Sequence, residues 1–237
     1  MSQLRVVADV HLDTEKAPER TAFFLSFLGR VAEEGGSLYL LGDLFAFWAN
    51  NKRLFRQYKP LFDCLKKLTA SGVKVSFLPG NRDFLLADEF LAGLGIETPG
   101  NECFLKLPPG RFYLTHGDEL CSDDLAYRRY KETWWPRFRM LDRLVPGKME
   151  IWLARRFMAR SKQVIEKQPG LDLKLSEAAL NKVFEQGADF IVCGHTHIPE
   201  DRRLGENRRL IVLPPWQDSQ GSYLLVNRET VEIRTYE

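Results

Sequence analysis

The sequence lacks the features of disulfide-stabilised or membrane-spanning proteins. Its four cysteines, Cys64, Cys103, Cys121 and Cys193, lie far apart and form no Cys-x-x-Cys pair. We expect them to be buried thiols in a reducing compartment, with disulfides or thiolate metal ligands as the alternatives. The chain contains no run of about 18 apolar residues, so we expect no transmembrane helix.

Two further absences narrow the classes of protein. The first residues reach a charged side chain after too few apolar positions for a signal peptide, so we expect a cytoplasmic protein. The formal net charge of +2 is too close to zero to indicate a partner. A chain of 237 residues suits one large domain, or a domain with an insertion, and can bury a core without disulfides.

Short apolar runs that end in polar, glycine-containing turns recur along the chain. Five of them have the length and composition of strands: Leu4–Ala8, Leu38–Leu41, Val73–Leu78, Phe112–Thr115 and Phe190–Cys193. Between them, residues 17–33 and 53–70 place apolar side chains at helical spacing. This alternation predicts an α/β fold with a largely parallel sheet and polar residues at the carboxyl ends of its strands.

The last part of the chain has a different pattern. Leu210–Leu213, Ser222–Val226 and Val231–Arg234 have the composition of strands and are separated by turn residues. We expect them to form a second, mixed or antiparallel sheet that completes a sandwich flanked by helices.

Residues 125–182 interrupt the strand pattern and predict a helical insertion within a single domain of residues 1–237. Residues 125–167 contain 12 Lys and Arg and four acidic residues, a net charge of +8, which leaves about −6 for the rest of the chain. A basic, aromatic helical segment can rest on anionic lipid or follow a nucleic-acid backbone. It can also pack on the core with its charged face in water.

Ligand-type side chains follow the predicted strands, and they include all four histidines. The seven site side chains are Asp9, His11, Asp43, Asn81, His116, His195 and His197. Two pairs, Asp9 with His11 and His195 with His197, are two residues apart, so an extended backbone turns both members to one face. Asp9-Val10-His11 alone is also typical of a surface pair, and Gly42-Asp43 of an ordinary turn. The joint pattern indicates a metal site.

The donor atoms of this set limit the choice of metal. Carboxylate and amide oxygens combined with imidazoles suit Mn²⁺, Fe²⁺ or Zn²⁺ better than Ca²⁺, which favours oxygen alone.

In order and context these motifs resemble the calcineurin-like metallophosphoesterases. The shared signature is D-x-H, GD, GN-x-[DE], H and GH-x-H, over residues 9–197. The resemblance implies a four-layer αββα sandwich and two metal ions. It implies that the first ion is bound by Asp9, His11, Asp43 and His197. Asp43 would bridge to the second ion, completed by Asn81, His116 and His195. Two divalent ions about 3.5–4 Å apart can clamp a phosphoryl group and generate a metal-bound hydroxide.

A narrower resemblance, to the UDP-2,3-diacylglucosamine diphosphatases of lipid A synthesis, depends on residues around these ligands. Gly80-Asn81-Arg82-Asp83-Phe84 has Arg where the broader family has His. The other matching stretches are Gly42-Asp43-Leu44-Phe45, residues 116–124 with Tyr127, Arg160-Ser161-Lys162, and Leu213, Trp216, Gly221 and Ser222. The resemblance implies Mn²⁺-dependent hydrolysis to UMP and 2,3-diacylglucosamine 1-phosphate, with hydroxide attacking the α-phosphorus.

The same resemblance implies roles for individual residues. Catalytic roles are expected for Asp43, Asn81, Arg82 and His116. Substrate contacts are expected from Asn81, Arg82, Asp124, Tyr127, Ser161, Lys162, Lys167 and His195. The guanidinium of Arg82 suits a diphosphate because it can grip two oxygens, although a salt bridge to Asp83 or Asp124 is the alternative. For Asp124 and Tyr127 the alternative is structural hydrogen bonding.

The expected partner is a lipid-linked UDP-sugar, and we expect no nucleic acid and no stable protein partner. The insertion would be a cap that holds the acyl chains and rests on the cytoplasmic face of the inner membrane. Ala46 and Ala49-Asn50-Asn51 replace an acidic residue and a Gly-Asp-Asp usual in that family, which leaves substrate identity open. The alternatives are another calcineurin-like phosphodiesterase or nuclease, or a scaffold that only binds proteins.

Overall fold

The structure, a computed structural model, describes residues 3–121, 174–205 and 207–237. Most of the predicted insertion lies outside these residues, and at its end helix α7 spans Glu177–Glu185. Five predicted substrate contacts also lie outside the described residues: Asp124, Tyr127, Ser161, Lys162 and Lys167. The helical cap and the single-domain organisation therefore stay predictions.

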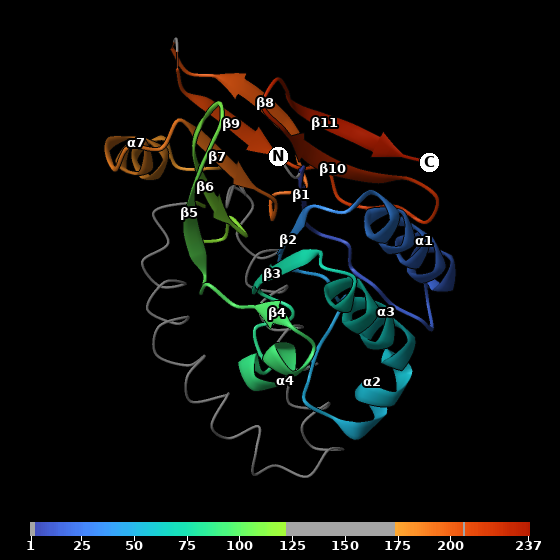
Figure 1. Ribbon diagram of the computed structural model, residues 1–237. Coiled ribbons are helices and arrows are strands. Elements are labelled where there is room, and N and C mark those ends of the chain that lie inside the picture. Colours follow the sequence, from blue (N-terminus) through green and yellow to red (C-terminus); the bar gives the residue numbers. More distant parts are fainter. Residues whose placement is uncertain (1–2, 122–173, 206) are drawn as a thin grey trace, which may run out of the picture.

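The first sheet has six strands in the order β11-β10-β1-β2-β3-β4 (Figure 1). Their bounds are β1 Leu4–Val7, β2 Ser37–Leu41, β3 Lys74–Leu78, β4 Ile96–Glu97, β10 Gly221–Val226 and β11 Val231–Tyr236. Strands β1 to β4 are parallel, as predicted, whereas β10 is antiparallel to β1 and β11 to β10.

The second sheet has five strands in the order β5-β6-β7-β9-β8. Their bounds are β5 Glu102–Leu107, β6 Gly110–Thr115, β7 Phe190–Cys193, β8 Glu200–Arg203 and β9 Arg209–Val212. Strands β6, β7 and β9 are parallel to one another. Strand β8 is Glu-Asp-Arg-Arg, so its pairing with β9, rather than any apolar pattern, makes it a strand.

The prediction that the last strands build the second sheet is wrong for two of them. Only β9 belongs to that sheet, whereas β10 and β11 complete the first one. The reason lies in the pairing of β10 with β1, which places Leu224 and Val226 beside Leu4 and Val6 in one apolar layer. Composition identifies these strands but does not specify their partners.

The helices also differ from prediction at one point. Helix α1 spans Pro18–Glu34, close to the predicted 17–33, and α4 spans Asp88–Gly93. The single helix predicted over 53–70 is instead two, α2 (Lys52–Gln57) and α3 (Lys59–Ala70), which meet at Tyr58. Pro60 has no N–H to continue the ladder from α2. Tyr58 donates its hydroxyl hydrogen to the Leu12 carbonyl at 2.8 Å, which fixes the junction.

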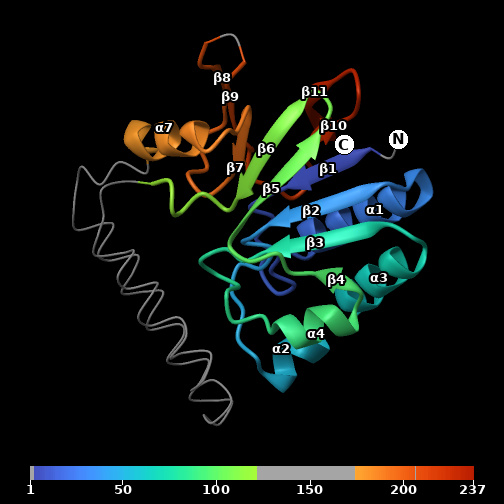
Figure 2. The same cartoon turned by 60° about the vertical axis from the view of Figure 1, so that its left-hand side comes forward.

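Three apolar clusters separate four layers of structure. One, with Phe27 and Leu38, lies between α1, α3 and the first sheet. The second, with Val6 and Leu114, lies between the sheets, and the third joins α7 to the second sheet. Figures 1 and 2 show the helices on the outer faces of the two sheets. The predicted four-layer αββα sandwich is confirmed.

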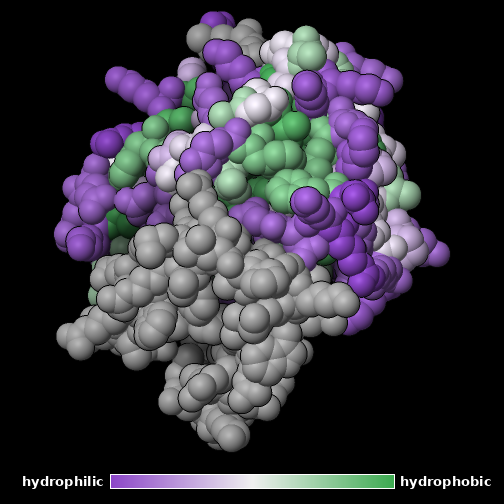
Figure 3. All heavy atoms as spheres, turned by 90° about the horizontal axis from the view of Figure 1, so that it is seen from below, coloured by the Kyte–Doolittle hydropathy of each residue, from purple (hydrophilic) through white to green (hydrophobic). Residues whose placement is uncertain are grey.

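The described residues expose few large hydrophobic side chains. Figure 3 shows one face on which hydrophobic side chains gather in a patch bordered by hydrophilic ones. Among the large hydrophobic residues of the described ranges, Ile198 alone is mainly exposed, at 61 %. Within those ranges every helix is too short or too polar to cross a bilayer.

The four cysteines are free thiols, as predicted, and the disulfide alternative is wrong. Cys193 is buried and the other three are half-buried. Burial raises the pKa of the Cys103 thiol to about 11 and that of Cys121 to about 12, so both stay protonated near neutral pH. None of the described cysteines belongs to a group with metal-binding spacing.

Candidate metal centre

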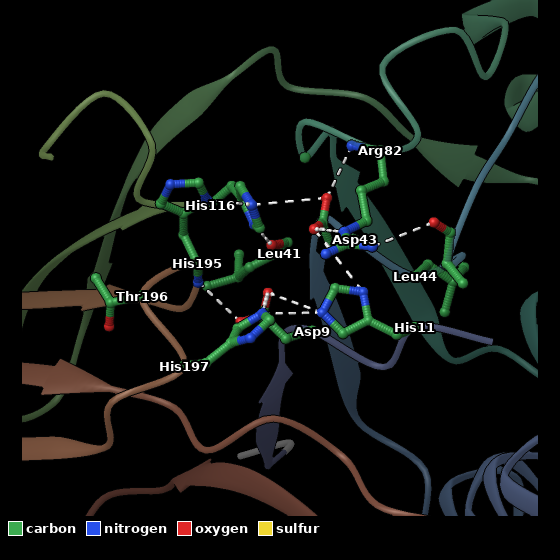
Figure 4. A network of polar contacts seen from close by, with 12 residues as sticks. Asp9, His11, Leu41, Asp43, Leu44, Arg82, His116, His195, Thr196 and His197 are labelled. Carbon is green, nitrogen blue, oxygen red and sulfur yellow. Dashed lines mark hydrogen bonds and ion pairs between the residues drawn. The ribbon is translucent and has the colours of Figure 1, made fainter. Parts of the chain in front are cut away.

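The seven site side chains converge where the carboxyl ends of strands from both sheets meet. In the first sheet, Asp9 and His11 follow β1, Asp43 follows β2, and Asn81 follows β3. In the second sheet, His116 follows β6, and His195 and His197 follow β7. Figure 4 shows the two aspartates and four histidines pointing toward one another across this edge.

The backbone at the site is strained. Five of the seven site residues have left-handed φ values: Asp9 52°, His11 51°, Asp43 49°, His195 69° and His197 56°. Across the described residues, these five are the non-glycine positions with positive φ. Such conformations cost on the order of 1 kcal/mol or more each and cluster at functional sites, where surrounding contacts enforce them.

The loops approach so closely that two glycines are required. A Cβ on Gly194 would lie 2.1 Å from Asp9 Oδ2, and one on Gly80 would lie 2.4 Å from Asp43 Oδ1. The His195 N–H donates to the same Asp9 Oδ2 at 2.8 Å. Gly194 therefore lets a loop of the second sheet reach a carboxylate of the first, and Gly80 lets two loops of the first sheet pack together.

Asp9, His11 and His197 form one group of ligand atoms within 4.8 Å of one another. His197 Nε2 lies 3.3 Å from Asp9 Oδ1 and 2.9 Å from His11 Nε2. Asp9 Oδ1 and His11 Nδ1 are buried without a hydrogen-bond partner among the described residues. Buried orphaned polar atoms are costly, and a bound cation would satisfy the carboxylate oxygen.

Asp9, Asp43 and His116 form a second such group. His116 Nε2 lies 3.7 Å from Asp43 Oδ1 and 3.2 Å from His195 Nδ1. The other ring nitrogen of His116 lies 2.8 Å from the Leu41 carbonyl, so it carries the hydrogen and the Nε2 lone pair faces the group. The Leu41 carbonyl thus selects the tautomer that can bind a metal.

The Asn81 amide turns one of its two polar atoms toward Asp43, at 2.9 Å from both carboxylate oxygens. With the amide nitrogen there, these are two hydrogen bonds. A half-turn of the amide replaces the nitrogen by oxygen, and three oxygens then face the same point. That arrangement is favourable only around a cation.

The surroundings of the site keep two of the histidines, His11 and His195, neutral near pH 7. Burial and the nearby Arg82 charge lower the pKa of His11 to about 3, and burial together with His116 lowers the pKa of His195 to about 4. At His116, burial lowers the pKa but the Asp43 and Asp9 carboxylates raise it, to a net value above the usual one. Burial alone would raise the pKa of Asp9. His197 and the other histidines lower this pKa by more than burial raises it, so its net value is about 2. An ionised carboxylate beside imidazoles with free lone pairs is a donor set that divalent metals bind.

Arg82 contacts the site directly, and its ion pair is with Asp43 rather than with Asp83, one of the two partners in the alternative for this residue. The backbone N–H donates to Asp43 Oδ1 at 2.9 Å, and Nε donates to Asp43 Oδ2 at 3.1 Å. The side chain is 38 % exposed, so part of the guanidinium faces solvent beside the carboxylate.

Asp83 is a structural part of the site that the sequence interpretation did not assign. Its two oxygens accept hydrogen bonds from the Gly80 N–H at 2.8 Å and the Leu44 N–H at 2.7 Å. The carboxylate is fully buried, and it joins the loop of Asn81 to the loop of Asp43. The signal in the sequence is an aspartate three residues after Gly80, where it can cap its own turn.

The residues that depart from the narrower family pattern support these same loops. Asn50 accepts from Trp48 Nε1 at 3.2 Å and donates to the Leu85 carbonyl at 2.6 Å. Asn51 caps α2 by accepting from the Arg53 N–H at 2.8 Å. An aspartate at position 50 could not donate to Leu85, so asparagine suits this connection between loops.

Comparisons with known proteins agree with the geometry. The profile of the family described as calcineurin-like phosphoesterase matches residues 3–199. A UDP-2,3-diacylglucosamine hydrolase of Haemophilus ducreyi is 34 % identical over 95 % of this chain and 97 % of its own. The Escherichia coli protein of that name is 32 % identical over 96 % of each chain. The crystal structure of TT1561 from Thermus thermophilus has a similar fold, with a TM-score of 0.53, 13 % identity and coverage of 99 % and 98 %.

Proposed function

Because the chain belongs to the calcineurin-like phosphoesterase family, we propose that it hydrolyses the diphosphate of UDP-2,3-diacylglucosamine. The products are UMP and 2,3-diacylglucosamine 1-phosphate. The observation that carries this proposal is similarity over nearly the full length of both chains to relatives named for that substrate. The seven site side chains supply a donor set that suits phosphate hydrolysis.

The proposal places two divalent cations, preferably Mn²⁺, among the seven site side chains. Asp9, His11, Asp43 and His197 hold the first, and Asp43, Asn81, His116 and His195 hold the second. The orphaned Asp9 Oδ1 and the low pKa values of His11 and His195 support this fit. When bound, such a pair lowers the pKa of a coordinated water and offsets charge on a phosphoryl group.

The charges of this chain's own residues favour an anionic substrate. Asp9 and Asp43 offset only half of the four positive charges that two divalent cations bring, so the loaded site stays cationic. Arg82 adds a further positive charge at the solvent-facing side of the site. Its ion pair with Asp43 holds the guanidinium in that position. Its role is to grip a diphosphate oxygen and to orient the α-phosphorus for attack by water.

The insertion completes the proposal. We assign residues 125–182 as a cap that holds the acyl chains and rests on the cytoplasmic face of the inner membrane, because residues 125–167 carry +8. Deleting residues 135–158 should leave a folded protein that hydrolyses the diacylated substrate poorly. Unchanged hydrolysis by that folded variant would refute the cap.

Product analysis tests the proposed function. The purified protein with Mn²⁺ and the diacylated UDP-sugar should release UMP, detected by mass spectrometry. In ¹⁸O water the label should appear in UMP, because attack at the α-phosphorus leaves the new oxygen there. Label in the sugar phosphate would place the attack on the other phosphorus.

The same assay separates the remaining alternatives. Cleavage of oligonucleotides, with the UDP-sugar left intact, would identify a nuclease and refute the proposal. Absence of phosphoesterase activity with Mn²⁺ on every substrate would identify a binding scaffold.

A further inference from the structure

The segment Leu213–Gly221, which we call the strap, runs from β9 across the carboxyl ends of both sheets. Its Leu213 N–H donates to the Cys193 carbonyl at 2.8 Å, at the end of β7. Its Trp216 N–H donates to the Asp9 carbonyl at 3.1 Å, just after β1. Pro214 and Pro215 lie between these two bonds and restrict the backbone. The strap therefore joins the two sheets at the edge where the ligands converge.

Trp216 anchors the strap in the core. Its ring is 2 % exposed and packs against Phe23, Phe24 and Phe27 of α1, with centroid distances of 6.0, 5.0 and 5.2 Å. Its Nε1–H donates to the Ser222 carbonyl at 2.9 Å. A Cβ on Gly221 would lie 2.6 Å from ring atoms Cη2 and Cζ3, so this glycine lets the ring sit where it does.

A second connection reaches the same ligand loop. Arg20 of α1 donates from Nε and Nη2 to Asp218 Oδ1, at 3.1 and 2.9 Å. Its Nη1 donates to the His11 carbonyl at 3.4 Å. The carbonyls of both Asp9 and His11 are thus held by the strap or by its partner, Arg20. These two residues have the strained φ values of 52° and 51°.

We propose that the strap, together with Arg20, sets the affinity of the first cation by holding Asp9 and His11 in their strained backbone conformation. This inference rests on the proposed metal site and makes Trp216 and Arg20 positioning residues. A strained conformation persists only where the surroundings over-determine it. Without the strap, the loop relaxes and the Asp9 and His11 side chains lose their convergence with His197.

The test is a Mn²⁺ titration of the purified, metal-free full chain. Calorimetry and electron paramagnetic resonance measure the number of bound ions and the affinity for each. The parent should bind two ions. Gly221→Ala, which forces the Trp216 ring to move, should weaken one of the two by about 10–100-fold, as loss of an outer-shell contact does. Arg20→Ala should weaken the same ion by on the order of tenfold. The second ion should keep its affinity within about twofold.

Arg30→Ala is the matched control, because Arg30 lies on the same helix and pairs with Glu34 at 3.0 Å, away from the loop of Asp9 and His11. It should bind both ions as the parent does. Should Gly221→Ala fail to fold, Arg20→Ala still decides, since exposed ion pairs contribute little to stability.

The outcomes distinguish the inference from the proposed function. If a folded Arg20→Ala or Gly221→Ala protein bound both Mn²⁺ ions with the parental affinities, the proposed role of the strap would be overturned. An equal loss of affinity for both ions would show a general structural effect and would also overturn this proposed role. A parent that binds no Mn²⁺ would refute the metal site itself.

Discussion

The two sheets contribute different chemistry to one site. Loops of the first sheet supply all the proposed oxygen ligands, from Asp9, Asp43 and Asn81, together with His11. Loops of the second sheet supply imidazoles alone, from His116, His195 and His197. Negative charge is therefore provided by one half of the sandwich, and the other half contributes imidazole nitrogens.

The two contributions also differ in burial. Asp9 and Asp43 are 0 % and 2 % exposed, whereas the side chain of His197 is 41 % exposed. The carboxylates occupy the interior between the sheets, and His197 lies at the solvent side. Loss of a buried carboxylate should therefore damage the site more than loss of the exposed imidazole.

The largest expected effect comes from Asp43, the proposed shared ligand. Asp43→Ala should lower turnover by more than about 100-fold, beyond the loss typical of residues that only orient a ligand. His197→Ala should lower it less, because the other ligands of the first ion remain. Activity on the diphosphate and Mn²⁺ stoichiometry measure both. An Asp43→Ala enzyme of near-normal activity would contradict the proposal that Asp43 binds both ions.

Arg82 should affect the substrate rather than the metals. Arg82→Ala removes charge-assisted hydrogen bonds worth about 1.5–3 kcal/mol, so turnover of the diphosphate should fall by about 10–100-fold. Arg82→Lys should recover part of this loss. Metal content, measured by elemental analysis, should stay at the parental value in both. Loss of metal from Arg82→Ala would show that the residue instead holds Asp43 in place.

Asp83 should be important for stability, because it joins two ligand loops of the first sheet. Asp83→Ala leaves two backbone N–H groups without an acceptor and should reduce the free energy of unfolding by about 2–4 kcal/mol. Asp83→Asn keeps one acceptor oxygen and should cost less. Urea denaturation of the metal-free protein measures this.

The control for Asp83 is Asp63→Ala, which removes only an exposed ion pair with Lys59 at 2.5 Å and should stay within about 1 kcal/mol of the parent. Equal losses for Asp83→Ala and Asp63→Ala would show that Asp83 does not join the loops.

The smallest effect is expected at the outer edge of the second sheet. A hydrogen bond and ion pair with Arg209 at 2.7 Å lower the pKa of Asp201. A carboxylate whose pKa is lowered by folding stabilises the fold at pH values above its pKa in the unfolded chain, about 3.9. This stabilisation is lost as the pH falls through the lower pKa of the folded state. Asp201→Asn should cost less than about 1 kcal/mol at pH 7. The difference in unfolding free energy from the parent, measured by denaturation, should narrow as the pH falls below about 4. A difference that stays constant there would contradict this account.

Much of the site was predictable from the sequence because its ligands follow apolar strands within short motifs. The spacing of Asp9 with His11 and of His195 with His197 predicted that both members of each pair face the site, but the extended backbone on which this prediction relied is wrong. The left-handed backbone at both pairs was not predictable, because tertiary contacts impose it.

Other features depend on long-range pairing. Strand β8 has no apolar residue and becomes a strand only beside β9. Strands β10 and β11 have clear strand composition, yet their sheet is set by the partner β1. Pro60 indicates the break between α2 and α3. The helical spacing of the apolar residues continues across this proline, so it predicted one helix instead of two.

Trp216 and Asp9, which form a hydrogen bond, are separated by most of the sequence. No local sequence pattern predicts such a contact. The sequence therefore predicted which side chains converge, but not the contacts that hold their backbone in place.

Crystals of the protein grown with Mn²⁺ test the central claim most directly, through an anomalous difference map. Two peaks about 3.5–4 Å apart should appear among the seven site side chains, with Asp43 between them. A single peak, or peaks away from this edge of the two sheets, would contradict the two-metal site.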